Sequence, residues 1–149
     1  MYPVTTNVTF GKQTGATPDG RNAHDPLADG ISQPQGMDTN GPTAILVSVS
    51  KINQKEYPNG TLLNMKFSPS CLQGEEGITK LTQLIQTYFD MGGMEMQINV
   101  IGVDTLKAAQ KNPDEYKDLV VRVAGFSAYF VELHITGQND LISRTELSL

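Results

Sequence analysis

The chain has 149 residues, of which 38% are hydrophobic and 18% are charged, a composition typical of one globular domain with its own core. Its formal net charge of −5 gives no electrostatic reason to expect nucleic acid or an anionic membrane as a partner. The single cysteine, Cys71, excludes an intrachain disulfide, and no secretory signal or membrane-length apolar run is visible. We therefore expect a cytoplasmic protein.

The first half of the chain predicts a long loop, one helix and one strand. Residues 11–42 are rich in Gly, Pro, Asp and Asn and lack apolar periodicity, so we expect a loop that is functional or packed on something larger. Ile45, Val49 and Ile52 have the spacing of one helix face and predict a short helix. The following segment, NGTLLNMKF, predicts an Asn-Gly turn and then a strand.

The middle of the chain predicts a helix followed by a strand. Residues 77–91 carry an apolar helix face, and Gly92-Gly93 ends it. Residues 94–101 alternate apolar and polar side chains, which predicts a half-buried strand. On this pattern the apolar side chains face the core, and the polar ones, Glu95, Gln97 and Asn99, face outward.

The last third predicts a helix, two strands and a final helix. Asp104 is expected to cap the helix TLKAAQK, which Pro113 ends. One strand leads into Gly125 and a second leads out of it, and a last helix is expected over residues 139–147. The fold class is therefore a mixed α/β or α+β unit.

Generic catalytic motifs leave the chain unassigned. FGKQTG has Thr6 where a phosphate-binding loop needs its first glycine, and no serine lies in a Gly-x-Ser-x-Gly elbow. His24 and His134 have no metal-ligand spacing and are interpreted as surface histidines. Cys71 lacks the neighbours of a nucleophile, and we expect no metal site.

Gly125 interrupts the best strand-forming stretch in the chain, VVRVAGFSAYFVEL. Glycine weakens a strand interior, so its presence there calls for a reason. The simplest interpretation is a hairpin glycine with positive φ.

A second interpretation comes from the surrounding sequence. RVAGFSAYF followed by ISRTEL resembles the C-terminus of glycyl radical enzymes, the pyruvate formate-lyase-like family. The resemblance continues in family order through TGATPDGRNAHDPLADGIS, DTNGPTAILVSVSKI, NGTLLNMKF, TYFDMGGMEMQINV and DTLKAAQKNPDEYKDLVVRV, and so covers essentially the whole chain. It implies that Gly125 carries a stored backbone radical, in a motif made of Arg122, Val123, Ala124, Gly125 and Phe126.

The chemistry of such a radical explains the glycine. An α-carbon radical is stabilised when it flattens, because the amide nitrogen then donates and the carbonyl withdraws across one conjugated system. A β-carbon would clash with the adjacent peptide groups in that geometry. Small Ala124 and aromatic Phe126 suit a tight loop inserted into an apolar cavity that excludes water.

The resemblance also implies a fold and a division of the chain. Residues 1–70 are expected to be the C-terminal end of a ten-stranded α/β barrel, including the long loop and the last strand, and residues 71–149 the glycine radical domain. MYPV resembles a cavity-lining segment of glycerol-dehydratase-like members, which makes Tyr2 a candidate substrate-pocket residue.

The chain departs from the family pattern at two points. Phe126 stands where the common motif has tyrosine. The family's thiyl-forming cysteine lies upstream on a finger loop, and no Gly-Cys-x-Glu stretch occurs here. Cys71 matches no such loop and is interpreted as a structural thiol, so the chain is not expected to be catalytic without a cysteine-bearing part.

Three functions follow from the resemblance. The first is the C-terminal fragment or subunit of a glycyl radical enzyme of dehydratase, lyase or decarboxylase type. Among these enzymes, its sequence most resembles glycerol and diol dehydratases. The second is a spare part resembling the autonomous glycyl radical cofactor, which repairs a damaged larger enzyme. The third is an inactive truncated fragment.

The implied partners are a small-molecule substrate, an upstream barrel chain that carries the thiyl cysteine, and an activating enzyme. That activating enzyme contains an iron–sulfur cluster, uses S-adenosylmethionine and abstracts hydrogen from Gly125. We expect no bound cofactor in this chain, only the stored radical.

Overall fold

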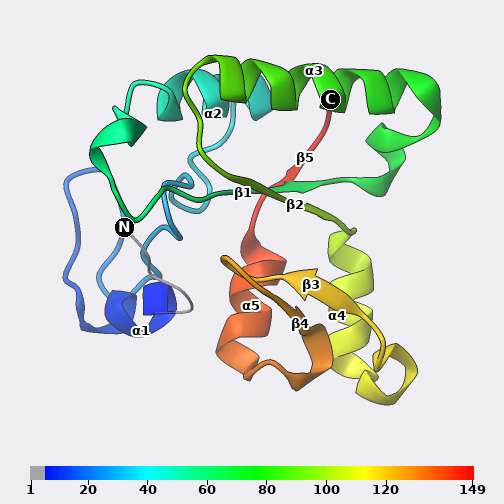
Figure 1. The fold of residues 1–149 in the computed structure, drawn as a ribbon. Coiled ribbons are helices and arrows are strands. Elements are labelled where there is room, and N and C mark those ends of the chain that lie inside the picture. The colour runs from blue at the N-terminus through cyan, green and yellow to red at the C-terminus, as the bar shows by residue number, and fades with distance from the viewer. Residues whose placement is uncertain (1–5) are drawn as a thin grey trace.

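The computed structural model of the chain describes residues 6–149 (Figure 1). Its helices and strands, in chain order, are α1 (Thr6–Gln13), α2 (Gly41–Val49), β1 (Leu63–Phe67), α3 (Gly74–Asp90), β2 (Met96–Val100), α4 (Val103–Lys111), β3 (Val120–Arg122), β4 (Ser127–Tyr129), α5 (Ile135–Ser143) and β5 (Glu146–Leu147). The mixed α/β class expected from the sequence is confirmed. Within residues 6–149, no helix has the length and apolar character needed to cross a membrane.

A parallel three-stranded sheet forms the centre of the molecule. Its strand order is β2-β1-β5, so β1 lies between the other two strands. Parallel strands require crossover connections, and helices supply them here. Figure 1 shows α2 and α3 on one side of this sheet, with α4, α5 and the β3–β4 hairpin on the other.

The apolar face of β1 packs against α2 and α3. Leu63, Met65 and Phe67 are at most 2% exposed and join a first core cluster with residues of α2, α3 and β5. Burying one side chain of this size contributes about 1.5–3 kcal/mol relative to leaving it in water. This cluster fixes the sheet to its helical layer.

A second core cluster fixes the hairpin to α4 and α5. Its buried members are Leu106, Ala109, Val121, Val123, Phe130 and Leu141. The β3–β4 hairpin is antiparallel, with Arg122 opposite Ser127. The hairpin therefore has its own apolar support, separate from the core above the sheet.

The predicted long loop is anchored on the sheet. Beyond α1, residues 14–40 contain no helix or strand. The loop meets the start of β1 at Ile31, whose N–H donates to the carbonyl oxygen of Leu62, the residue before the strand (2.9 Å). Gly30 has φ of +56° and lies so close to this carbonyl that any side chain would collide with it. The predicted loop is present over residues 14–40, whereas Gly11, Lys12 and Gln13 belong to α1.

The structure contains the predicted helix before β1, the strand β1 and the long helix α3, but α2 ends at Val49, before Ile52, and α3 begins at Gly74 rather than Gly77. The cap of α4 differs from the prediction. Gly102 occupies the N-cap, and Asp104 lies in the first turn without forming the cap. The Glu146 carboxylate of β5 accepts a hydrogen bond from Val103 N–H at 2.8 Å instead. A tertiary contact thus satisfies the helix N-terminus.

The last helix begins earlier than predicted. It covers Ile135–Ser143 rather than residues 139–147, because the His134 ring accepts a hydrogen bond from Thr136 N–H and starts the helix there. Arg144 is extended, and Glu146–Leu147 pairs with β1 as β5. Pairing with the sheet overrides the helical pattern of the last residues.

Candidate functional site

Four polar side chains share the second face of the sheet. Asn64 and Lys66 on β1 are in register with Gln97 and Asn99 on β2, and all four are at most 8% exposed. We call these four residues the polar face. The prediction that the polar residues of β2 face outward is therefore wrong. The prediction that the apolar residues of β2 face the core is also wrong at Val100, whose side chain is 47% exposed.

Gly125 lies in the tight turn that connects β3 and β4. The turn, residues 123–126, has a hydrogen bond from Val123 N–H to Phe126 O (2.9 Å). Gly125 has φ of +83°, a conformation that favours glycine. The interpretation of a hairpin glycine with positive φ is confirmed. Ala124 is buried, and Gly125 is exposed at the tip of the hairpin.

Side chains of the polar face bind the backbone that leads into this turn. Asn99 accepts from Arg122 N–H and donates to Arg122 O, both at 2.8 Å. Gln97 Oε1 accepts from Gly125 N–H at 3.0 Å. Backbone groups need partners, and these amide side chains take the place of a neighbouring strand. The polar residues of β2 are buried because they hold the hairpin.

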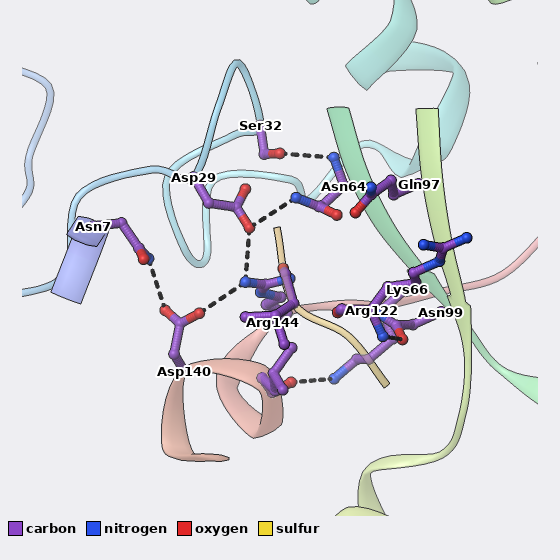
Figure 2. A network of polar contacts seen from close by, with 12 residues as sticks. Asn7, Asp29, Ser32, Asn64, Lys66, Gln97, Asn99, Arg122, Asp140 and Arg144 are labelled. Carbon is purple, nitrogen blue, oxygen red and sulfur yellow. Dashed lines mark hydrogen bonds and ion pairs between the residues drawn. The ribbon is translucent and has the colours of Figure 1, made fainter. Parts of the chain in front are cut away.

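Arg144 supplies a third contact to the turn and connects it to two other segments. Its Nη1 donates to Val123 O at 2.8 Å, and its Nη2 lies 2.7 Å from Asp29 Oδ2 and 2.9 Å from Asp140 Oδ2. The arginine side chain is 14% exposed and each carboxylate side chain 6%. Figure 2 shows Arg144 between the two acids. The long loop, α5 and the glycine turn therefore meet at one cation.

The two acids are held by further polar contacts. Asp29 Oδ2 accepts from Asn64 Nδ2 (3.1 Å), and Asp140 Oδ1 accepts from Asn7 Nδ2 (3.3 Å) (Figure 2). Asp140 Oδ1 also accepts from Gln35 Nε2 (2.9 Å). Burial raises the pKa of Asp140, and the neighbouring charge of Arg144 opposes this shift. The pKa of Asp140 stays raised in part because the nearby charge of Asp29 repels the ionised form of Asp140. Asp29 also shares Arg144 with Asp140.

Lys66 brings a second cation to the polar face. It is 3% exposed, and its Nζ donates long hydrogen bonds to Leu141 O (3.4 Å) and Ile142 O (3.3 Å). Burial lowers the pKa of Lys66, while the negative charge of Glu146 works in the opposite direction. The negative charge of Glu146 therefore offsets only part of the cost of burying the positive charge of Lys66.

Lys66→Met is expected to change how stability depends on pH. Because the folded pKa of Lys66 lies below its ordinary 10.5, the unfolded state binds more protons between these two values. The stability contribution of Lys66 therefore rises as the pH increases through this window. Urea unfolding at a series of pH values should show the wild type gaining stability relative to Lys66→Met.

The exposed Lys107 of α4 provides a control for the loss of one positive charge, as Lys107→Met. A difference in unfolding free energy between wild type and Lys66→Met that stays constant up to about pH 10.5 would contradict the expectation for Lys66.

The predicted motif residues occupy different positions around the turn. The side chain of Arg122 is exposed and only its backbone is held, while Val123 and Ala124 are buried. Phe126 is half-buried against the second core cluster. Tyr2 lies outside the described residues.

The remaining candidates lie away from the turn or on the surface. Cys71 packs on the first core cluster, and its Sγ donates to Ser68 O at 3.1 Å. His24 and His134 are exposed, as predicted. Residues 6–149 contain no group of three or more His, Cys, Asp or Glu side chains that could hold a metal ion.

The sequence interpretation missed Gln97, Asn99, Asp29 and Asp140 as supports of the turn. One signal was present for the first two: the outward positions of β2 carry amides, which can donate and accept, rather than mainly charged groups. Arg144 lies inside the ISRTEL segment, but its partners come from segments more than a hundred residues apart. Asp140 and Arg144 have the local i,i+4 spacing of a helix pair, but no local pattern connects either of them to Asp29.

Fold and site together define a domain that presents one glycine α-carbon at the tip of a hairpin whose backbone is held by buried side chains. The sequence model described as "Glycine radical" matches residues 27–131. The chain belongs to the glycine radical family, as the sequence resemblance indicated.

Curated relatives include the isethionate sulfite-lyase of Bilophila wadsworthia, 52% identical over 96% of this chain and 18% of the relative. The trans-4-hydroxy-L-proline dehydratase of Clostridioides difficile is 47% identical over 98% of this chain and 18% of its own length. This chain thus spans about a fifth of the length of these relatives.

Among solved structures, the B12-independent glycerol dehydratase from Clostridium butyricum matches with a TM-score of 0.97 and 53% identity, covering all of this chain and 19% of the dehydratase. The match lies in the C-terminal region of glycyl radical enzyme barrels.

Proposed function

We propose that the chain acts as the radical-storing C-terminal part of a glycyl radical enzyme, with Gly125 as the radical site. The observation that supports this most directly is the position of Gly125. Gly125 is exposed in a positive-φ turn, and its peptide group and those around it are held by Gln97, Asn99 and Arg144. A turn that only reverses the chain does not need this buried polar support.

The proposed chemistry begins with an activating enzyme that uses an iron–sulfur cluster and S-adenosylmethionine. It removes one hydrogen atom from the α-carbon of Gly125 and leaves one unpaired electron there. Gly125 then takes a hydrogen atom from a cysteine thiol on the barrel part, which becomes the thiyl radical that attacks the substrate. Glycine is required because the radical flattens and a β-carbon would oppose this.

The residues flanking Gly125 shape the turn in this proposal. Arg122, Val123, Ala124 and Phe126 form the radical loop, and the buried Val123 and Ala124 fix its base. We retain Cys71 as a structural thiol, because it packs on the first core cluster while the turn packs on the second.

The remaining assignments also stay proposals. Residues 1–70 would close the barrel and residues 71–149 would form the glycine radical domain, with β1 joining the two through β2 and β5. Tyr2 remains a candidate pocket residue. Since the names of the relatives include dehydratases and a sulfite-lyase, we propose an elimination reaction on a small hydroxylated substrate.

A chimera provides the test of this function. Residues 1–149 replace the matching C-terminal region of the Clostridium butyricum glycerol dehydratase, and glycerol dehydration is measured after anaerobic activation. We expect turnover with the wild-type segment and none with Gly125→Ala. Gly137→Ala is the control, because a β-carbon added at Gly137 would have Leu133 Cβ as its nearest neighbour, at 4.0 Å. A folded chimera that carries a radical yet does not turn over would contradict radical transfer.

A second arm of the same test supplies this chain as a separate polypeptide to a dehydratase that lacks its own C-terminal region. Restored turnover would favour the spare-part alternative. Turnover only in the covalent chimera would favour the C-terminal part of a larger enzyme. A folded chimera and a folded separate chain that never activate would favour the inactive fragment.

A further inference from the structure

One contact at the turn reaches the proposed radical centre itself. Gln97 Oε1 accepts from Gly125 N–H at 3.0 Å, and Gln97 Nε2 donates to Glu95 Oε1 at 3.2 Å. The Gln97 side chain is 7% exposed. It therefore forms a buried link between a carboxylate and the amide nitrogen that would share the unpaired electron.

Both partners fix the orientation of the Gln97 amide. A backbone N–H can only donate, so the side-chain oxygen must face Gly125. An ionised carboxylate can only accept, so the NH₂ group must face Glu95. Glu95 directly precedes β2 and is two residues from Gln97, so the contact between the two side chains is local.

The electronic consequence follows from the direction of these hydrogen bonds. The charge of Glu95 polarises the Gln97 amide and raises the electron density on its oxygen, which strengthens that oxygen as an acceptor. A stronger acceptor polarises the Gly125 N–H bond and makes the nitrogen a better electron donor. Donation from this nitrogen is one of the two effects that stabilise an α-carbon radical.

The conformation of Gly125 adds a geometric consequence. With φ of +83°, the carbonyl carbon of Gly125 lies far out of the plane of the Ala124–Gly125 peptide group. A flat radical needs this carbon near that plane, so rotation about the N–Cα bond must accompany radical formation. Gln97 holds the Ala124–Gly125 peptide group on the amide side of this bond.

We propose that Gln97, supported by Glu95, is a positioning residue that orients the Gly125 amide and increases its electron donation to the stored radical. This inference rests on the proposed function of Gly125. It differs from a purely structural role because it predicts a change in the spin density on nitrogen.

The test uses the full chain made with nitrogen-15-labelled glycine and activated anaerobically by the activating enzyme of a close relative. Electron paramagnetic resonance measures the nitrogen coupling of the radical, and its decay gives the half-life. Gln97→Met removes the acceptor oxygen but keeps a side chain of similar length. We expect a smaller nitrogen coupling and a radical half-life about fivefold shorter, which is the change in an equilibrium constant when one net hydrogen bond is lost.

Two further variants separate electronics from folding. Gln97→Glu keeps an acceptor oxygen, so it should retain more of the nitrogen coupling than Gln97→Met. Glu95→Gln keeps an acceptor for Gln97 without the charge and should give a coupling between wild type and Gln97→Met. Gln86→Met, at an exposed position of α3, is the matched control and should resemble wild type.

The outcomes distinguish the two levels of the proposal. A wild-type radical with unchanged coupling and half-life in Gln97→Met would overturn the role of Gln97 and leave Gly125 as the radical site. Absence of a radical in folded wild type, with an activating enzyme that works on its own partner, would overturn both. If Gln97→Met fails to fold, an unchanged coupling in Glu95→Gln overturns the role of the Glu95–Gln97 pair.

Discussion

Anaerobic treatment of the chain with S-adenosylmethionine and an activating enzyme is expected to give an organic-radical resonance centred on Gly125. The signal should be a doublet, because one α-hydrogen remains on the carbon that carries the unpaired electron. Gly125→Ala should give no signal, since its methyl group opposes the flat radical. Alanine at φ of +83° also costs about 1 kcal/mol or more of folding stability, so circular dichroism must show that the variant is folded.

Air should then cut the activated chain at Gly125. Oxygen adds to the α-carbon radical and the backbone breaks there, so mass spectrometry should find a C-terminal piece beginning near Phe126. Gly137→Ala should leave both signal and cut unchanged. If a folded wild-type chain gives neither, while the same activating enzyme works on a full-length relative, Gly125 is only a turn glycine.

Arg144→Met is expected to destabilise the fold by about 3–5 kcal/mol, the range measured when one partner of a buried ion pair is removed. The substitution leaves Asp29 and Asp140 buried, with side chains 6% exposed, and without their shared cation. It also removes the donor to Val123 O. A domain of this size typically has about 5–15 kcal/mol of stability, so urea unfolding should show a large shift.

Lys80→Met is the matched surface control. Lys80 pairs with Glu76 at 3.0 Å on α3, but the two side chains are 47% and 83% exposed, so we expect a loss of at most about 0.5 kcal/mol. Arg144→Lys should fall between the two variants, because one ammonium group cannot match the planar contacts of the guanidinium. Equal unfolding midpoints for Arg144→Met and Lys80→Met would contradict the role given to Arg144.

Local patterns were sufficient to predict the elements whose residues make mainly local contacts. Apolar spacing located α3, and the glycine inside a strand-forming stretch located the hairpin and its tip. The helix α1 had no such signal, because it lacks an apolar stripe. It is attached by Asn7, which is buried and bonded to Asp140 on α5.

The supports of the glycine turn could not be predicted in the same way. Alternation in β2 indicates two faces, but it does not state what covers the polar one. Here the cover is a hairpin whose backbone amides need partners, so Gln97 and Asn99 are buried. The site therefore depends on which segment packs on the sheet, and that information is tertiary.

The pairing of β5 with β1 has a consequence for the oxygen reaction. A cut at Gly125 would break the covalent connection of residues 126–149 to the rest of the chain. These residues nevertheless include β5, which pairs with β1, and Arg144, which binds Asp29. Phe130, also in this piece, is fully buried in the second core cluster. A nicked molecule is therefore expected to keep its shape and to elute as one species under native conditions. The cut is detected only under denaturing conditions, in which the two pieces unfold and separate.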